Sequence, residues 1–478
     1  MAPMPSRSAL LALTAALLLG GCSSGDQASF DRSRSATTAT VLPPASSTTT
    51  HPVATTPSCP ANPARAEPDP ARPRYTLAVD VSPGEGVVQG RQQVVFTPDV
   101  DTDRLVFRLW PNGSPATPAG AAATREPGPV TVGGRPATST RDDATTLSVR
   151  TGAGFRARQP VDIALTWRLE IAGPANDRIS RNGDALRLGS FFPVLPWEPG
   201  VGWATDPPAG PFAEASTSPT ADFDLTVSVP DGFGVLASGA PDPARPGHYT
   251  ASAMRDVAVS VGRFDTVSAV AMAPQPVQVT VGVHRGVLES GAQYLERTVA
   301  SLEDFGRRFG PYPWTTFTMA VTPDLGGGFE YPAHVMQGTG TLGIVAHEVG
   351  HQWFYALVGN DQGRDPWLDE GLATWSDARF ARALDRLQSR VVPAVARNMV
   401  GQPMTFWADK GRAYQEGVYT QGAQALAALG DPDLVDCALR VYVAQHAHRI
   451  ARQADLVRSL STVFPDAAAT LAAYGVKA

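Results

Sequence analysis

The sequence predicts an α+β chain of several domains, in which an N-terminal antiparallel β domain precedes a mostly helical domain. Three observations lead to this fold class. Between residues 73 and 262, apolar and polar residues alternate in short runs, as they do in half-buried antiparallel strands. After residue 290, apolar residues recur every three or four positions, which is typical of amphipathic helices. The 478 residues, of which 43% are apolar, are enough for two or three domains.

The N-terminus carries a leader that is not part of the fold. An apolar run from Ala9 to Leu19 follows a single arginine and is too short to span a bilayer. We expect residues 1–21 to be a secretory signal peptide. The stretch LGGC, which ends at Cys22, resembles a bacterial lipobox and implies cleavage before Cys22 and lipidation of its thiol. The prediction is a lipid anchor on the extracytoplasmic face of a bacterial cell membrane. The alternative is an ordinary signal peptide with an incidental cysteine.

Residues 22–72 are predicted to be a disordered tether. They are rich in Ser, Thr, Pro and Ala and contain few large apolar residues, so they cannot bury enough surface to offset the entropy of ordering. Besides Cys22, the chain contains Cys59 within this tether and Cys437 in a predicted helix. An extracytoplasmic compartment permits a disulfide. Because Cys59 lies in the tether, however, we expect no structural bridge to Cys437.

The β domain is predicted over residues 73–262. Runs such as RYTLAVDVS, VVQGRQQVVF and DFDLTVSVP have a period of two, and Pro-Gly, Asn-Gly and Gly-Gly pairs separate such runs and mark turns. We expect an antiparallel saddle or sandwich. The formal net charge of the whole chain is −6, without a basic run. This charge pattern argues against a nucleic-acid partner.

The second domain is predicted over residues 263–478. It opens with strand-like sequence, and the segment GAQYLERTVASLEDFGRRFG at 291–310 then predicts a helix whose apolar face includes Leu302 and Phe305. From Thr341 onward the chain is mainly helical in pattern.

A predicted helix at 341–357 carries the strongest chemical signal. It contains His347 and His351 four residues apart, with Glu348 directly after the first. Residues i and i+4 lie on one helix face, so both imidazoles can bind one tetrahedral zinc ion, and Glu348 flanks that ion as a candidate general base. The chain has only 8 histidines, so this spacing is uncommon by chance. The alternative is a buried helix whose histidines bond to each other or to carbonyls, with Glu348 in a structural ion pair.

A catalytic zinc site needs a third protein ligand and one open position. Glu370 follows His351 after 18 intervening residues. Asp365 as the N-cap and Pro366 as the first helical residue predict that a helix begins here, and the intervening loop lets it lie beside the first helix. We therefore expect one Zn²⁺ per chain, held by His347, His351 and Glu370.

His-Glu-x-x-His followed by a glutamate inside WLDEG resembles the aminopeptidase N family of zinc metallopeptidases, the gluzincins related to leukotriene hydrolase. Three further segments fit in order and rough spacing. GGGFEYP at 326–332 resembles the exopeptidase motif Gly-x-Met-Glu-Asn, and FGPYPWTTFTMAV at 309–321 resembles the approach to it. AYQEGVYTQGAQAL at 413–426 resembles the segment that carries the catalytic tyrosine. The resemblance covers most of residues 75–425 and is strongest from 305 to 425.

The resemblance implies a thermolysin-like catalytic domain and a zinc aminopeptidase that acts on peptides outside the cytoplasm. It implies that Glu330 binds the substrate's free α-amine and that Tyr419 donates to the developing oxyanion. Tyr414 competes for that second role, and a core tyrosine is the structural alternative. The resemblance also implies that a peptide backbone lies along the strand formed by the glycines before Glu330, namely Gly326, Gly327 and Gly328.

The sequence also departs from the family pattern. Phe329 and Tyr331 replace the usual Met and Asn of the exopeptidase motif, and the second amine-binding residue that the family's β domain supplies is not identifiable. We expect the C-terminal helical domain of longer members to be absent. Two other functions therefore stay open. One is a zinc endopeptidase or broader metallopeptidase, and the other is a catalytically silent, peptide-binding surface lipoprotein.

Overall fold

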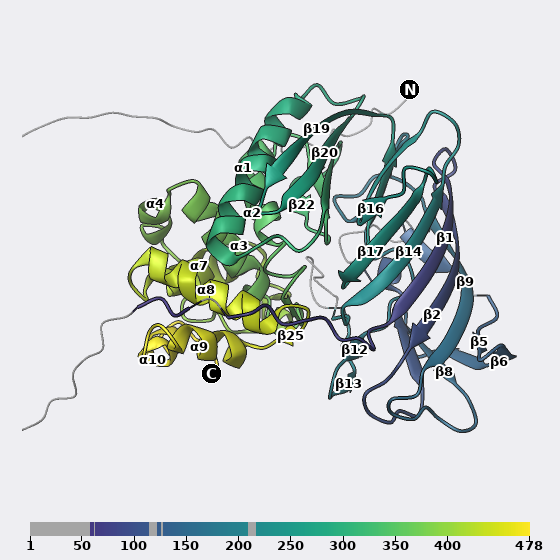
Figure 1. The fold of residues 1–478 in the computed structure, drawn as a ribbon, viewed down its shortest axis with the longest axis horizontal. Coiled ribbons are helices and arrows are strands. Elements are labelled where there is room, and N and C mark those ends of the chain that lie inside the picture. Colours follow the sequence, from purple (N-terminus) through teal and green to yellow (C-terminus); the bar gives the residue numbers. More distant parts are fainter. Residues whose placement is uncertain (1–57, 62, 114–121, 126–127, 209–216) are drawn as a thin grey trace, which may run out of the picture. The chain divides into compact units, whose positions relative to one another are not determined.

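The computed structural model describes residues 58–61, 63–113, 122–125, 128–208 and 217–478. Within them, a part built from strands leads into a part rich in helices (Figure 1). This order confirms the predicted α+β fold class. The predicted leader and Cys22 lie outside the described residues.

The largest sheet belongs to the N-terminal part. Its order is β16 (Ala240–Pro241), β17 (His248–Met254), β14 (Ala221–Ser228), β1 (Arg74–Ser82), β2 (Val87–Phe96), β9 (Val161–Ile171), β5 (Thr131–Val132) and β6 (Arg135–Pro136), and β4 (Ala122–Arg125) also pairs with β9. Neighbouring strands are antiparallel except for β1 and β14, which are parallel. In β1, buried and exposed residues alternate, as the period of two predicts.

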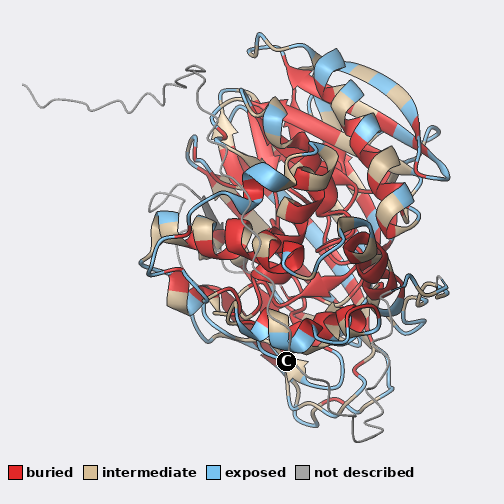
Figure 2. Cartoon of the chain, turned by 90° about the vertical axis from the view of Figure 1, so that its left-hand side faces the viewer, coloured by how far each residue is buried: buried red, intermediate tan, exposed pale blue. Residues whose placement is uncertain are grey.

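Smaller sheets complete the β domain. One has the order β10 (Ile179–Asn182), β11 (Ala185–Leu188), β18 (Val259–Gly262) and β15 (Gly234–Ala237), another has β3 (Leu105–Arg108), β8 (Thr146–Arg150) and β7 (Thr138–Arg141), and β12 (Trp197–Glu198) pairs with β13 (Gly202–Trp203). Leu77 of β1 and Leu188 of β11 belong to one buried cluster, so these sheets share a core. Figure 2 shows buried residues filling the interior.

The second domain begins with a five-stranded sheet. Its order is β19 (Phe264–Met272), β20 (Pro276–His284), β21 (Thr316–Thr322), β23 (His334–Gly338) and β22 (Gly328–Phe329), so β22 is an edge strand. Helix α1 (Gly291–Phe309) packs on β19 and β20 and buries Leu302 and Phe305, as predicted. The edge position of β22 leaves one side of its backbone available for other partners.

Helices form most of the remaining chain. They are α2 (Val345–Gly350), α3 (Trp367–Phe380), α4 (Leu384–Gln388), α5 (Met404–Trp407), α6 (Gly411–Tyr414), a π-helical turn (Gln415–Thr420), α7 (Gln421–Ala427), α8 (Pro432–His446), α9 (Gln453–Ser461) and α10 (Ala467–Ala472). The short strands β24 (Gly359–Asn360) and β25 (Ile450–Ala451) pair in parallel. The structure contains no helix, among the residues it describes, with the length and apolar content that a membrane span requires.

Helix α2 is shorter than the helix predicted at 341–357. A 3₁₀ turn precedes it, and the helix ends at Gly350. The side chain of Gln352 then binds the loop before β23, because its Oε1 accepts from Ala333 N at 2.8 Å and its Nε2 donates to Tyr331 O at 3.1 Å. Beyond it, Tyr355 has a positive φ of 127°, which turns the chain out of the helix. His351 keeps helical backbone angles, so both histidines still lie on one face.

The predicted cap of α3 is wrong in detail. Pro366 has helical backbone angles directly before Trp367, as predicted, but the Asp365 side chain does not cap the helix. The Asp365 carboxylate instead accepts a hydrogen bond from Gln453 Nε2 at 2.6 Å. A distant partner in α9 therefore competes successfully with the local backbone amides.

The described residues 58–61 and 63–72, here called the strap, correct two predictions. Cys59 forms a disulfide with Cys437 of α8, with Cα atoms 5.8 Å apart. Ala66 N donates to Ala444 O of α8 at 2.7 Å, and Arg72 pairs with Asp222 of β14 at 2.8 Å. The tether prediction fails for this segment because a covalent bond and polar contacts, rather than apolar burial, hold it. In Figure 1 the strap passes α8 on its way to β1.

Removing the strap's disulfide should destabilise the protein. The double variant Cys59→Ser/Cys437→Ser is expected to lower the free energy of unfolding by about 2–5 kcal/mol, because the bond constrains the unfolded chain over a long loop, here with a sequence separation of 378 residues. Denaturant unfolding of both proteins measures this difference. Reductant should shift the wild type toward the variant and leave the variant unchanged. Equal free energies of unfolding for the double variant and for the wild type with its disulfide intact would contradict a stabilising role of this bond.

Candidate metal centre and substrate cavity

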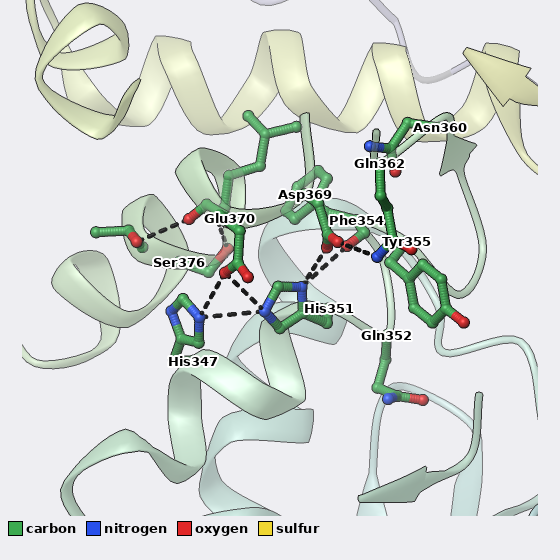
Figure 3. Close-up of polar contacts among 12 residues, drawn as sticks. His347, His351, Gln352, Phe354, Tyr355, Asn360, Gln362, Asp369, Glu370 and Ser376 are labelled. Atoms are coloured by element: carbon green, nitrogen blue, oxygen red, sulfur yellow. Dashed lines mark hydrogen bonds and ion pairs between the residues drawn. The ribbon is translucent and has the colours of Figure 1, made fainter. Parts of the chain in front are cut away.

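Helix α2 and the residue that caps its C-terminus present two imidazoles toward a common point (Figure 3). Nε2 of His347 and Nε2 of His351 lie 3.1 Å apart, and the two ring planes are nearly perpendicular at 83°. His351 is 1% exposed, and His347 is 14% exposed at its side chain. The arrangement is the one that the spacing of four residues predicts for a shared ligand.

Glu370 closes this group from α3, which packs against α2. Its Oε2 lies 3.1 Å from His347 Nε2 and 3.5 Å from His351 Nε2. A tetrahedral zinc with bonds of about 2.0–2.1 Å places its ligand atoms about 3.3 Å apart. Two nitrogens and one carboxylate oxygen are also a donor set that zinc prefers. The residues present therefore fit the ion.

The charge of the site also suits a dication. Glu370 is buried, yet its hydrogen bonds to His347 and His351 outweigh burial and hold the pKa of Glu370 well below its usual range. Burial alone would lower the pKa of His351, but the carboxylates of Asp369 and Glu330 outweigh it and raise that pKa well above the usual range. A cluster of buried carboxylates around two imidazoles is costly without a cation.

Asp369 supports a ligand in a way that sequence reasoning missed. Its Oδ1 lies 2.5 Å from Nδ1 of His351, and its Oδ2 accepts from Gln362 Nε2 at 2.5 Å. A proton on Nδ1 leaves Nε2 of the same ring free for a metal. The signal was available, since Asp369 directly precedes a predicted ligand. Thr374, one turn after Glu370, donates its hydroxyl hydrogen to the main-chain oxygen of Glu370 at 2.7 Å.

Glu348 lies behind the edge strand β22. It is 3% exposed. One of its carboxylate oxygens, a carboxylate oxygen of Glu330 and a ring nitrogen of His351 lie within 4.8 Å of one another. A Cβ added to Gly328 would lie 2.3 Å from Glu348 Cδ. A side chain at position 328 would therefore have to displace the Glu348 carboxylate.

Gly328→Ala should disable the site without unfolding the protein. The new methyl group must displace the Glu348 carboxylate, so we expect kcat to fall by about 10²-fold, the lower range for a lost general base. Gly343→Ala is a matched control beside α2, because a Cβ there meets nothing within 4 Å. Steady-state kinetics with zinc analysis measures both. Normal kcat in a folded Gly328→Ala protein would refute this packing argument.

The structure separates the two candidate tyrosines. Tyr419 lies on the π-helical turn, its hydroxyl donates to Glu370 Oε1 at 2.5 Å, and its ring stacks on that of His347 at 5.7 Å. Tyr414 is 1% exposed and packs against the rings of Tyr419 and Trp407. Tyr419 lines the cavity described below, and Tyr414 does not.

A cavity of about 550 Å³ joins these groups, within the range of about 300–1,000 Å³ typical of small-ligand sites. Glu330 lies in its wall, 8% exposed, and burial raises the pKa of Glu330 to about 7. Every predicted metal and catalytic residue and all three predicted glycines line this one cavity, together with Arg390 and residues of the β domain. The lining includes Asn176, Asp177, Arg178, Gly326, Gly327, Gly328, Glu330, His347, Glu348, His351, Glu370, Arg390 and Tyr419.

The β-domain residues Asn176, Asp177 and Arg178 are the part of the cavity that sequence reasoning missed. Asn176 Oδ1 accepts from the main-chain N of Gly326 at 2.8 Å, and the Arg178 guanidinium lies 4.8 Å from the centre of the Phe329 ring. These residues precede β10 in the sequence segment GPANDRIS, which has no motif that marks it.

The chain is similar in sequence to known aminopeptidases. Residues 332–472 match the Peptidase family M1 domain. The chain is 31% identical over 183 residues to aminopeptidase M1-C of Oryza sativa subsp. japonica, a match that covers 32% of this chain and 20% of that protein. It is 23% identical over 367 residues to human aminopeptidase B, covering 65% of this chain and 52% of that protein. The matches thus span a fifth to about half of these relatives.

Solved structures show the same fold. The M1 zinc metallopeptidase from Deinococcus radiodurans aligns with a TM-score of 0.63 and 19% identity, covering 84% of this chain and 93% of that chain. A variant of that protein bound to the substrate Tyr-Ser-Ala aligns with a TM-score of 0.64 and 19% identity, covering 85% of this chain and 94% of that chain.

Proposed function

We propose that the chain, which matches the Peptidase family M1 domain over residues 332–472, is a zinc-dependent aminopeptidase that removes N-terminal residues from peptides outside the cytoplasm. One observation carries the proposal. The three zinc-fitting donors, a buried glutamate beside them, a tyrosine hydroxyl and a second buried glutamate line a single cavity. Each group has the chemistry that one step of amine-directed peptide hydrolysis needs.

His347, His351 and Glu370 would hold the zinc, and Asp369 would fix the ring of His351. Zinc, when bound, lowers the pKa of a coordinated water towards 7 and polarises the scissile carbonyl. The protein itself excludes solvent from this point, since His351 and Glu370 are 1% and 4% exposed. Low exposure strengthens every electrostatic contact made there.

Glu348 would be the general base. Its carboxylate takes a proton from the attacking water and delivers it to the nitrogen of the leaving amine, so that the carbon–nitrogen bond breaks with a neutral leaving group. Tyr419 would donate its hydroxyl hydrogen to the carbonyl oxygen as that oxygen gains negative charge. The stacked ring of His347 fixes the direction of the Tyr419 side chain.

Glu330 would bind the free α-ammonium group of the substrate. A buried carboxylate beyond the zinc ligands forms an ion pair with charge-assisted hydrogen bonds to an ammonium group, and this ion pair is lost with an acetylated nitrogen, which is neutral. The edge strand β22 can pair with the substrate backbone beside it. The contact between Glu330 and the ammonium group is the one that distinguishes an aminopeptidase from a broader metallopeptidase.

Glu330→Gln tests the amine contact. We expect KM for an alanyl-nitroanilide to rise at least about tenfold, because a charge-assisted hydrogen bond contributes about 1.5–3 kcal/mol, and we expect the zinc content to stay at one per chain. The wild type should not hydrolyse the N-acetylated substrate. Hydrolysis of both substrates at similar rates would instead assign the chain to the broader metallopeptidases.

We also propose membrane attachment through a lipid on Cys22, supported by the LGGC stretch at the end of the apolar leader. The anchored enzyme would act on the extracytoplasmic face of the cell membrane. Fractionation of bacteria that produce the wild type or Cys22→Ala tests this proposal. Recovery of both proteins in the same fraction would exclude the anchor.

A further inference from the structure

Arg187 is a buried arginine whose hydrogen bonds all lead to loops around the cavity. It lies in β11 and is 2% exposed. A guanidinium group has five N–H donors, and five acceptors surround this one. They are Asp177 O at 3.0 Å from Nε, Thr322 Oγ1 at 3.1 Å and Pro323 O at 2.8 Å from Nη1, and Ala175 O at 2.6 Å and Asp324 O at 3.3 Å from Nη2.

The five acceptors come from two segments in different domains, a loop before β10 and the end of β21 with the loop after it. Residues 175–177 belong to the β domain and lead into Arg178, which lines the cavity. Thr322 ends β21, and Pro323 and Asp324 follow it and lead into Gly326–Gly328 and then Glu330. Asp324 has a positive φ of 58°, a strained conformation for a residue with a side chain, and its carbonyl is one of the acceptors. Arg187 therefore forms hydrogen bonds to both segments that wall the cavity near Glu330, where the substrate amine would bind.

A direct contact between the two loops depends on this arrangement. Asn176 Oδ1 accepts from Gly326 N at 2.8 Å, at the start of the segment that forms the edge strand. Asn176 itself is exposed, so its position follows from the main chain on either side of it. That main chain is bonded to Arg187 at residues 175 and 177.

We propose that Arg187 is a positioning residue for amine recognition, because it fixes the loop of Asn176 and the segment that leads to Glu330 at the separation that a substrate amine requires. The inference rests on the proposed aminopeptidase function. Burial lowers the pKa of Arg187 to about 10, so the guanidinium remains charged near neutral pH. Lysine, with three donors in another geometry, cannot make the same five bonds.

Arg187→Ala is the first test. We expect KM for an alanyl-nitroanilide to rise at least about tenfold, since a misplacement of about 1 Å has large kinetic effects. The kcat should stay within about threefold, because the zinc ligands and Glu348 lie on other elements, and the zinc content should stay at one per chain. Low-millimolar guanidinium chloride, but not sodium chloride, should restore KM by filling the cavity that the side chain leaves.

Arg255→Ala is the matched control. Arg255 is 3% exposed and also joins the two domains through main-chain oxygens, with bonds to Ser218 O at 2.9 Å and Tyr355 O at 2.6 Å. It does not line the cavity. Its loss should lower the melting temperature and leave KM within twofold, with no rescue by guanidinium. A general loss of domain packing would instead raise KM in both variants and overturn the proposal.

Hydrogen exchange gives a readout that is independent of catalysis. The main-chain amides of residues 322–330 should exchange faster in Arg187→Ala than in Arg255→Ala. If Arg187→Ala does not fold, Arg187→Lys takes its place, with the same expected rise in KM. An active wild type together with unchanged KM and exchange in a folded Arg187 variant would overturn the proposal. An inactive wild type whose Arg187 variant still shows faster exchange would instead contradict the aminopeptidase function and leave the positioning role standing.

Discussion

Glu348→Gln is expected to lower kcat by about 10²–10⁴-fold, the range that general acid–base catalysis contributes, while the protein keeps one zinc per chain. The glutamine has nearly the shape of the glutamate, so the packing of Glu348 against Gly328 is preserved. It cannot accept a proton from water, and it cannot deliver one to the leaving amine. Steady-state kinetics on an alanyl-nitroanilide, with metal analysis of the same sample, measures both quantities.

The control for this variant is Glu296→Gln, which changes an exposed glutamate on α1 and should leave kcat and zinc unchanged. A Glu348→Gln protein with full activity would refute the role of Glu348 as base. Loss of zinc from that variant would show that Glu348 acts on the metal and not on the water.

Glu370→Ala should have an effect of similar size through a different route. The variant loses one of three protein donors to zinc, and we expect the zinc content to fall from one per chain to below about a tenth under dialysis, with hydrolysis lost in proportion. Asp369→Asn should be intermediate, with zinc affinity reduced by about 10–100-fold, because Asp369 only orients His351.

Added zinc distinguishes these two variants. An excess should restore Asp369→Asn and should not restore Glu370→Ala at the same concentration. Full retention of zinc by Glu370→Ala would contradict the assignment of the third ligand, and a metal-free Asp369→Asn that cannot be reloaded would place Asp369 among the ligands themselves.

The metal centre could be predicted from the sequence because its geometry is local. His347 and His351 are separated by a fixed helical spacing, so their mutual position does not depend on the rest of the fold. Glu370 required only that a second helix lie beside the first. The fold class followed in the same way from periods of two and of three to four residues.

Features that depend on partners far away in the sequence could not be predicted from it. The bond between Cys59 and Cys437 joins residues 378 positions apart, and the composition around Cys59 indicated a tether. Arg187 occupies an ordinary position in a short strand, and only the assembled loops show what it binds. Asn176 enters the cavity only because two domains meet there. Such long-range contacts have no periodic or motif-based signal.

The most direct test of the central claim compares two substrates of the zinc-loaded wild type, an alanyl-nitroanilide and its N-acetylated form, each with and without a chelator. We expect that only the substrate with a free amine is hydrolysed, that the chelator abolishes this activity, and that added zinc restores it. Hydrolysis of the blocked substrate at a similar rate, or no chelator-sensitive hydrolysis of either substrate, would contradict a zinc aminopeptidase.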